Sequence, residues 1–361
     1  MSKFRYLCSA AVALAFVAGP SALHAEHRDR TLVVTMTNDS IDNRITVYDA
    51  DTHALLQTLS THGQGGAGGN ARGVKQHDGD LVAAVNNGSN NVALFKRVGD
   101  ILRFDKVVST TSPPVSVDFG NDHMYVAGTT TVDSFAMQHD SVQWLDGTTD
   151  LELAGGGAPP NGSTAQVGVI NGKQLLVTLK TDPDPGTLDI VALHDGRVTG
   201  AVPTAISAPQ GTLAPFGFAV YRDGTALITL AHSNQVGLFR DGAFASVVDA
   251  GQAADCWMTA VGKYAFTANT GSRTLSRLIG SGSNVFVDSL VAAHIAGGAP
   301  ADIDADAGFL GVIDHGAGQS HLSLFRYNTF GELTTDGTPI TVGVPDANGL
   351  AILTAGDRDR Q

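Results

Sequence analysis

The chain has little cysteine, few aromatic residues and a low content of charge. Among its 361 residues only Cys8 and Cys256 are cysteines, which excludes a fold held together by a network of disulfide bonds. Charged residues make up 16% of the chain, against about a quarter in average globular domains. The net charge is −13 and no basic cluster is present, which excludes the usual electrostatic basis of nucleic-acid binding.

Long apolar runs are also absent after the N-terminal region, so the sequence predicts no membrane span. Residues 1–25 have the pattern of a secretory signal peptide. Lys3 and Arg5 precede an apolar run from Leu7 to Gly19, and Ala25 fits the residue before the cleavage site. We therefore expect an exported chain of residues 26–361, periplasmic or secreted. A retained N-terminal anchor is the alternative.

Glycine is the residue in excess, with 43 copies, and it accompanies an internal repeat. Hairpins made of a short apolar strand, a turn of Asn, Gly and Ser, and a second strand recur at 32–49, 81–95, 227–239, 264–278 and 309–325. A further short strand is expected at 71–76, 115–119, 165–170, 216–221, 256–261, 301–304 and 348–353. Consecutive starts of these strands are from 40 residues (Phe216 to Cys256) to 51 residues (Ala165 to Phe216) apart.

A four-strand repeat of this period is typical of a β-propeller. The strand at 348–353 supplies the inner strand that the hairpin at 32–49 lacks, so the two ends of the chain would close the ring. The sequence thus predicts an all-β fold, a single domain of seven blades with four antiparallel strands each. The glycine-rich stretches 63–70 and 154–162 are interpreted as loops between blades, with a linker between independent domains as the alternative.

Strands that end in Asn, as in TANTGS (267–272) and AVNNGSN (84–90), give the chain a resemblance to YVTN-type repeat propellers. More closely, the chain resembles the lactonase-like seven-bladed family, which includes enzymes similar to 6-phosphogluconolactonase and to fungal carboxymuconate-lactonizing enzymes. The resemblance implies a site at the mouth of the central channel and a His-rich stretch on an inner strand. The expected inner strands of this chain contain no histidine, and this departs from the family pattern.

In a propeller, the start of each inner strand and the turn after the second strand lie at the same end, so residues distant in sequence converge there. Lactone hydrolysis needs a base that activates water and a donor for the carbonyl oxygen. We expect His315 or His232 as the base, Arg72 as the group that holds a carboxylate or the oxyanion, and Asp302 or Asp255 as the partner of an imidazole. Candidates for substrate binding are Asn86, Asn269, Asp346 and Asn348. The alternative is a polar channel lining that bonds only to itself or to water.

No metal site is predicted, because no paired Cys or His spacing suggests zinc. The alternation of Asp302, Asp304 and Asp306 would place like charges on one face of a strand, which leaves a divalent cation such as calcium open as a cofactor. In the alternative, Asp306 already lies in the following turn.

Two other features are interpreted as structural. Asp182, Asp184 and Asp189 are expected in an exposed loop, since their spacing lacks the full calcium-loop pattern. Cys256 is expected to be buried beside Trp257, because no electropositive neighbour in sequence would activate its thiol.

Two classes of function follow from these observations. The first is a lactonase-like hydrolase, a monomer that acts on a small lactone. The second is a non-catalytic exported propeller that binds a small ligand or a protein partner. A metal- or quinone-dependent oxidoreductase rests on analogy of fold alone.

Overall fold

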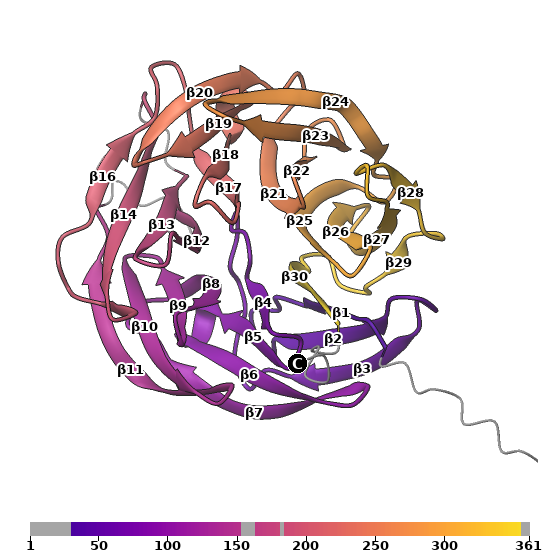
Figure 1. Ribbon diagram of the computed structural model, residues 1–361. Helices are drawn as coiled ribbons and strands as arrows, with labels where there is room; N and C mark the ends of the chain where they lie inside the picture. Colours follow the sequence, from indigo (N-terminus) through magenta and orange to yellow (C-terminus); the bar gives the residue numbers. More distant parts are fainter. Residues whose placement is uncertain (1–29, 153–162, 181–183, 355–361) are drawn as a thin grey trace, which may run out of the picture.

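The computed structural model describes residues 30–152, 163–180 and 184–354. Its strands form seven antiparallel sheets arranged radially around a common axis, which confirms the predicted seven-bladed propeller (Figure 1). The expected signal peptide, the expected loop at 154–162 and Asp182 lie outside the described residues. No helix in the described part of the chain is long and apolar enough to cross a membrane.

Blade 1 joins the two ends of the chain. Its strands, from the axis outward, are β30 (Asn348–Leu353), β1 (Leu32–Met36), β2 (Arg44–Asp49) and β3 (Leu55–Ser60). Leu32 pairs with Leu353 in the antiparallel ladder between β1 and β30. The predicted closure of the ring by the C-terminal strand is therefore confirmed.

Four further blades have the regular pattern of four strands. Blade 2 contains β4 (Val74–His77), β5 (Leu81–Asn86), β6 (Asn91–Val98) and β7 (Ile101–Ser109). Blade 3 contains β8 (Pro114–Gly120), β9 (His123–Gly128), β10 (Thr131–Gln138) and β11 (Ser141–Asp150). Blade 5 contains β17 (Pro215–Val220), β18 (Ala226–Leu230), β19 (Gln235–Arg240) and β20 (Ala243–Asp249). Blade 6 contains β21 (Asp255–Val261), β22 (Tyr264–Asn269), β23 (Thr274–Ser281) and β24 (Asn284–His294).

Blades 4 and 7 each have a broken outermost strand, so each counts five strands where four were predicted. Pro203 and Pro339 lie in the interruptions, and proline has no N–H to donate to a ladder. Blade 4 contains β12 (Thr164–Ile170), β13 (Gln174–Leu179), β14 (Thr187–His194), β15 (Arg197–Val198) and β16 (Thr204–Ser207). Blade 7 contains β25 (Ala299–Asp306), β26 (Phe309–Gly316), β27 (Gln319–Tyr327), β28 (Leu333–Thr335) and β29 (Ile340–Thr341).

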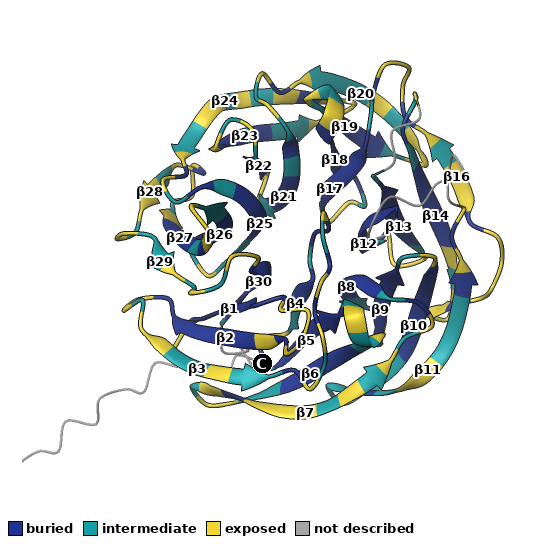
Figure 2. Ribbon diagram, turned by 180° about the vertical axis from the view of Figure 1, so that it is seen from behind, coloured by how far each residue is buried: buried dark blue, intermediate teal, exposed yellow. Residues whose placement is uncertain are grey.

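Each sheet buries its faces against the neighbouring blades. The inner strands contain no exposed residue, whereas exposed residues gather on outer strands such as β7, β11 and β24 (Figure 2). Between blades 5 and 6, for example, Val236, Met258 and Leu278 belong to one buried apolar cluster. Two short 3₁₀ turns, η1 (Asn87–Ser89) and η2 (Ala231–Ser233), are the helical elements of the described residues, as the absence of helical periodicity predicted.

Two expectations about strands and loops are wrong. The inner strand of blade 2 begins at Val74 rather than at residue 71, and it extends to His77, so an inner strand does contain a histidine. Asp189 lies in β14 with no solvent exposure instead of in an exposed loop, and it accepts the backbone N–H of Glu152 at 2.8 Å. Burial raises the pKa of Asp189 to about 6. Asp184 is exposed, as expected.

Candidate functional site

The connection between blades 1 and 2 does not simply pass from one blade to the next. Its residues 68–73, which we call the crossing segment, run across the propeller axis before β4 (Figure 1). Asn70 accepts the indole Nε1–H of Trp257 on its backbone oxygen at 2.8 Å and the amide of Asn348 on its side-chain oxygen at 2.8 Å. Its own amide donates to the backbone oxygen of Val115 at 2.5 Å. Asn70 thereby ties together blades 6, 1 and 3.

Further contacts fix both sides of the crossing segment. The backbone N–H of Ala71 donates to the backbone oxygen of Ala165 in blade 4 at 3.0 Å. The ammonium group of Lys180, also in blade 4, donates to the backbone oxygens of Gly68 and Gly69 at 2.8 and 2.7 Å. Burial lowers the pKa of Lys180 to about 8. The segment is therefore held by hydrogen bonds to blades on every side of the axis.

A pocket of about 480 Å³ lies against this segment at the end of the propeller where the inner strands begin. We call it the rim pocket. Its walls come from the turn after β1, the glycine-rich residues 66–69, the start of β25 and the segment before β30, together with single residues of β21, of β26 and of the turn after β22. The side chains that matter for its chemistry are Asn38, Asp39, Ser40, Trp257, Thr270, His315, Asp346 and Asn348.

His315 is the one imidazole that lines the rim pocket. Its Nε2 lies 2.8 Å from the backbone oxygen of Ala347. Because a carbonyl oxygen only accepts hydrogen bonds, Nε2 carries the proton and Nδ1 of the neutral ring keeps its lone pair. The chain therefore provides a half-buried imidazole whose basic nitrogen is not used by this contact.

Two carboxylates, Asp39 and Asp346, also line the pocket, and both are exposed. Asp39 Oδ1 accepts the backbone N–H groups of Asp42 and Ile41 at 3.0 and 2.7 Å. These bonds, from Asp42 first and then Ile41, lower the pKa of Asp39. The neighbouring Asp314 is instead fully buried, with His321 Nδ1 at 3.2 Å and Ser323 Oγ at 3.3 Å, and burial raises its pKa.

Three of the predicted site residues thus meet in the rim pocket: His315, Asp346 and Asn348. Asn348 acts there mainly as a support, since its amide donates to Asn70. Arg72 lies deeper along the crossing segment and does not line the pocket. Its guanidinium donates to the backbone oxygen of Phe218 at 3.4 Å, and its backbone N–H donates to Asp302 Oδ2 at 3.3 Å.

The other predicted residues are placed elsewhere. Asp302 is almost fully buried and also accepts the N–H of Ile303 at 2.9 Å. Asp255 has no solvent exposure, and neither of its carboxylate oxygens has a hydrogen-bond partner among the described residues. Burial raises the pKa of both carboxyl groups to about 7. His232 is exposed in η2, outside the rim pocket.

Asn86 and Asn269 are buried supports inside their blades. The amide of Asn86 donates to Asn91 Oδ1 at 2.8 Å, and that of Asn269 donates to Ser276 Oγ at 2.8 Å. Each bond links the end of a second strand to the third strand of the same blade. The recurring Asn that suggested the repeat therefore stabilises the turn between these strands.

Sequence reasoning missed the glycine-rich wall of the pocket and the role of Trp257. The available signal was length. The connection from β3 to β4 spans residues 61–73, whereas those from β7 to β8 and from β20 to β21 span only 110–113 and 250–254. A connection that long has enough residues to reach the axis and return.

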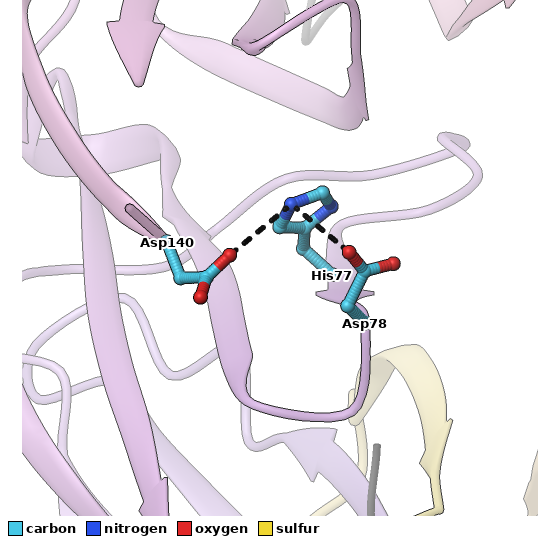
Figure 3. Close-up of side chains that lie close together, drawn as sticks. All are labelled: His77, Asp78 and Asp140. Carbon is cyan, nitrogen blue, oxygen red and sulfur yellow. Dashed lines mark ion pairs between the residues drawn. The ribbon is translucent and has the colours of Figure 1, made fainter. Parts of the chain in front are cut away.

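The three aspartates of β25 do not form a group of possible metal ligands in the described part of the chain. Asp306 is the last residue of that strand rather than part of the following turn. A cluster with suitable atoms within 4.8 Å of one another is formed by His77, Asp78 and Asp140 (Figure 3). His77 Nε2 lies 3.6 Å from Asp78 and 3.9 Å from Asp140, so ion pairing accounts for this arrangement without an ion.

Solved structures share this architecture. The periplasmic gluconolactonase PpgL of Pseudomonas aeruginosa superposes with a TM-score of 0.65 at 15% identity, over 90% of this chain and 99% of that one. The chain has the fold of the lactonase-like seven-bladed propellers. A candidate 6-phosphogluconolactonase of Bacteroides fragilis gives a TM-score of 0.64 at 14% identity, over 90% and 98%. A streptogramin B lyase gives 0.54 at 12% identity, over 74% and 82%. No family model and no curated protein matches the sequence.

Proposed function

We propose that the chain is an exported hydrolase that opens a small, sugar-derived lactone in the rim pocket. The observation that carries this proposal is His315, which lines the pocket with its Nε2 occupied by the backbone oxygen of Ala347 and with no contact to its Nδ1 among the described residues. The likeness in fold to a gluconolactonase suggests the class of substrate. The N-terminal pattern and that periplasmic neighbour support export.

The reaction would begin with a water molecule between His315 and the lactone carbonyl. Nδ1 of His315 removes a proton from the water as its oxygen bonds to the carbonyl carbon. Gly68 and Gly69 line the same pocket and their backbone N–H groups have no acceptor among the described residues, so these groups are candidates to stabilise the oxyanion. The ring ester C–O bond then breaks, and the imidazolium returns its proton to the leaving oxygen to give the hydroxy acid.

Proton release from D-glucono-1,5-lactone tests the proposal, with spontaneous hydrolysis subtracted. The variant His315→Gln keeps a side-chain donor for Ala347 but has no base, so kcat should fall at least 100-fold, within the range of general-base effects. His232→Gln is the matched control, because this histidine is exposed outside the pocket. Wild-type turnover that survives in His315→Gln would refute this assignment of the base.

The alternative is a non-catalytic propeller that binds a small ligand at the same place. One observation favours it: the side-chain donors of the pocket are used within its wall. Those of Trp257 and Asn348 bond to Asn70, and that of Asn38 bonds to the backbone oxygen of Ala67. This leaves few side-chain donors for a transition state. Saturable binding of a sugar lactone without turnover in the same assay would favour this alternative.

A further inference from the structure

We infer that the rim pocket accepts an uncharged polyol lactone and discriminates against the phosphorylated form of the same sugar. This inference rests on the proposed function for its chemistry, but it concerns the charge of the ligand. It comes from the charged groups that line the pocket and from the partners of three cations in segments next to it.

Among the described residues, the pocket is lined by two carboxylates and by no lysine or arginine. Asp39 and Asp346 are both exposed, and His315 is the one other titratable side chain in its lining. Bonds to its carboxylate hold the pKa of Asp39 low, so this group is ionised at neutral pH. A ligand therefore meets negative charge at the pocket wall.

Three cations in segments next to the pocket are engaged with protein groups. Lys180 donates to the backbone oxygens of Gly68 and Gly69, behind the glycine-rich wall. Arg44 contacts Asp42 Oδ2 through Nε at 2.9 Å and through its terminal nitrogen at 2.6 Å. Arg72 donates to the backbone oxygen of Phe218. Each of these three groups would have to leave its present partner to bind a phosphate.

Part of the glycine-rich backbone is also engaged. The N–H groups of Gly66 and Ala67 both donate to Asn38 Oδ1, at 2.9 and 3.1 Å. This side-chain oxygen occupies the place where an anion would sit in such a turn. The remaining N–H groups, of Gly68 and Gly69, are assigned above to the lactone carbonyl.

A phosphate dianion in this pocket would lose hydration and face two like charges without a cationic partner. Hydroxyl groups of an uncharged polyol would instead donate hydrogen bonds to Asp39 and Asp346. The preferred substrate class is therefore an uncharged aldonolactone, and the two carboxylates are the determinants of this specificity.

The test compares glucono-1,5-lactone with its 6-phosphate at low ionic strength. For the wild type we expect kcat/KM to be at least 10-fold higher on the uncharged lactone. Asp346→Lys should reduce this ratio at least 5-fold. Asp150→Lys is the matched control, because it makes the same change in net charge on the exposed edge strand of blade 3 and should leave the ratio unchanged. Equal or better turnover of the phosphorylated lactone by the wild type would overturn the inference.

A binding measurement separates this inference from the proposed function. Glucitol and glucitol 6-phosphate have no ester to hydrolyse, so calorimetric titration reports only the preference of the pocket. Tighter binding of glucitol that is lost in Asp346→Lys would support the inference even if no lactone were turned over. Tighter binding of glucitol 6-phosphate, or binding of neither compound, would refute it whatever the hydrolysis assay shows.

Discussion

The indole Nε1 of Trp257 donates a hydrogen bond to the backbone oxygen of Asn70 at 2.8 Å, across 187 residues of sequence. Trp257 belongs to the inner strand of blade 6 and Asn70 to the crossing segment. Both residues are buried, and Trp257 also lines the rim pocket. The wall of the candidate site is therefore held in place by a bond that no local sequence pattern specifies.

Trp257→Phe should destabilise the protein and weaken ligand binding. Removal of the indole N–H leaves the buried oxygen of Asn70 without this donor, which costs about 1–3 kcal/mol. Chemical denaturation measures the loss, and the KM for the lactone should rise because the wall moves. The control is Trp144→Phe, which changes the other tryptophan of the chain at a position that is 63% exposed. Equal stability of the two variants would show that the bond to Asn70 contributes nothing.

Gly65→Ala should be more harmful than most glycine substitutions. A Cβ at residue 65 would lie 2.4 Å from the backbone carbon of Asn38 and 2.6 Å from its oxygen. Because backbone atoms cannot rotate away, the glycine-rich wall has to shift, at a cost of about 2–3 kcal/mol. Gly99→Ala is the control, since its φ of +62° carries strain but no atom lies within 4 Å of the new methyl group. Thermal unfolding of both variants, together with their lactone KM values, would show whether the close approach matters more than the backbone strain.

The fold could be predicted from the sequence because its signals are local. The hairpins are specified by alternating apolar residues, by Asn and Gly turns and by a period of 40–51 residues. The strand expected at 348–353 has the same bounds as β30. The closure of the ring follows from counting strands. Each of these features depends on residues that are close in sequence, so one chain is enough to reveal it.

The site was harder to predict because it depends on contacts distant in sequence. Residues 71–73 have the composition of a strand, but the bonds of Ala71 and Arg72 to Ala165 and Asp302 draw them across the axis. The stretch that ends at Asp189 has the composition of a loop, yet Asp189 is buried and accepts the N–H of Glu152. His315, Asp346 and Asn348 do line one pocket, because propeller geometry brings the ends of second strands and the starts of inner strands to the same end, but their role as a site stays a prediction.

The thiol of Cys256 should be unreactive in the folded protein. Cys256 is half-buried rather than fully buried as expected, but burial still raises the pKa of its thiol to about 11, and the adjacent Asp255 also disfavours the thiolate. A rise of this size lowers the thiolate fraction about 100-fold at pH 8. Iodoacetamide labelling followed by peptide mass spectrometry should therefore be at least 100-fold slower on Cys256 in the native protein than in denaturant. Comparable rates in the two conditions would contradict this environment.

Asp255 should make the protein less stable as the pH rises towards 8. Burial, reinforced by Asp249, raises the pKa of Asp255 to about 7, above the value near 4 expected in the unfolded chain. The folded state then binds a proton that the unfolded state has lost, so the stabilisation is complete below about pH 4 and disappears as the pH passes 7. At pH 8 the fold holds a buried carboxylate with both oxygens unpartnered.

Asp255→Asn removes this charge, so it should raise the free energy of unfolding at pH 8 by about 2 kcal/mol more than at pH 5. Urea denaturation at both pH values measures the difference.

Asp302→Asn is the informative comparison, because burial raises the pKa of Asp302 to about 7 as well. Its two oxygens, however, accept the N–H groups of Arg72 and Ile303. An amide has only one acceptor oxygen, so Asp302→Asn would lose one of these two bonds. We expect the free energy of unfolding at pH 8 to rise for Asp255→Asn but not for Asp302→Asn. This result would distinguish a buried carboxylate without partners from one that accepts hydrogen bonds from the crossing segment. The account of Asp255 fails if its amide variant is no more stable than the wild type at pH 8.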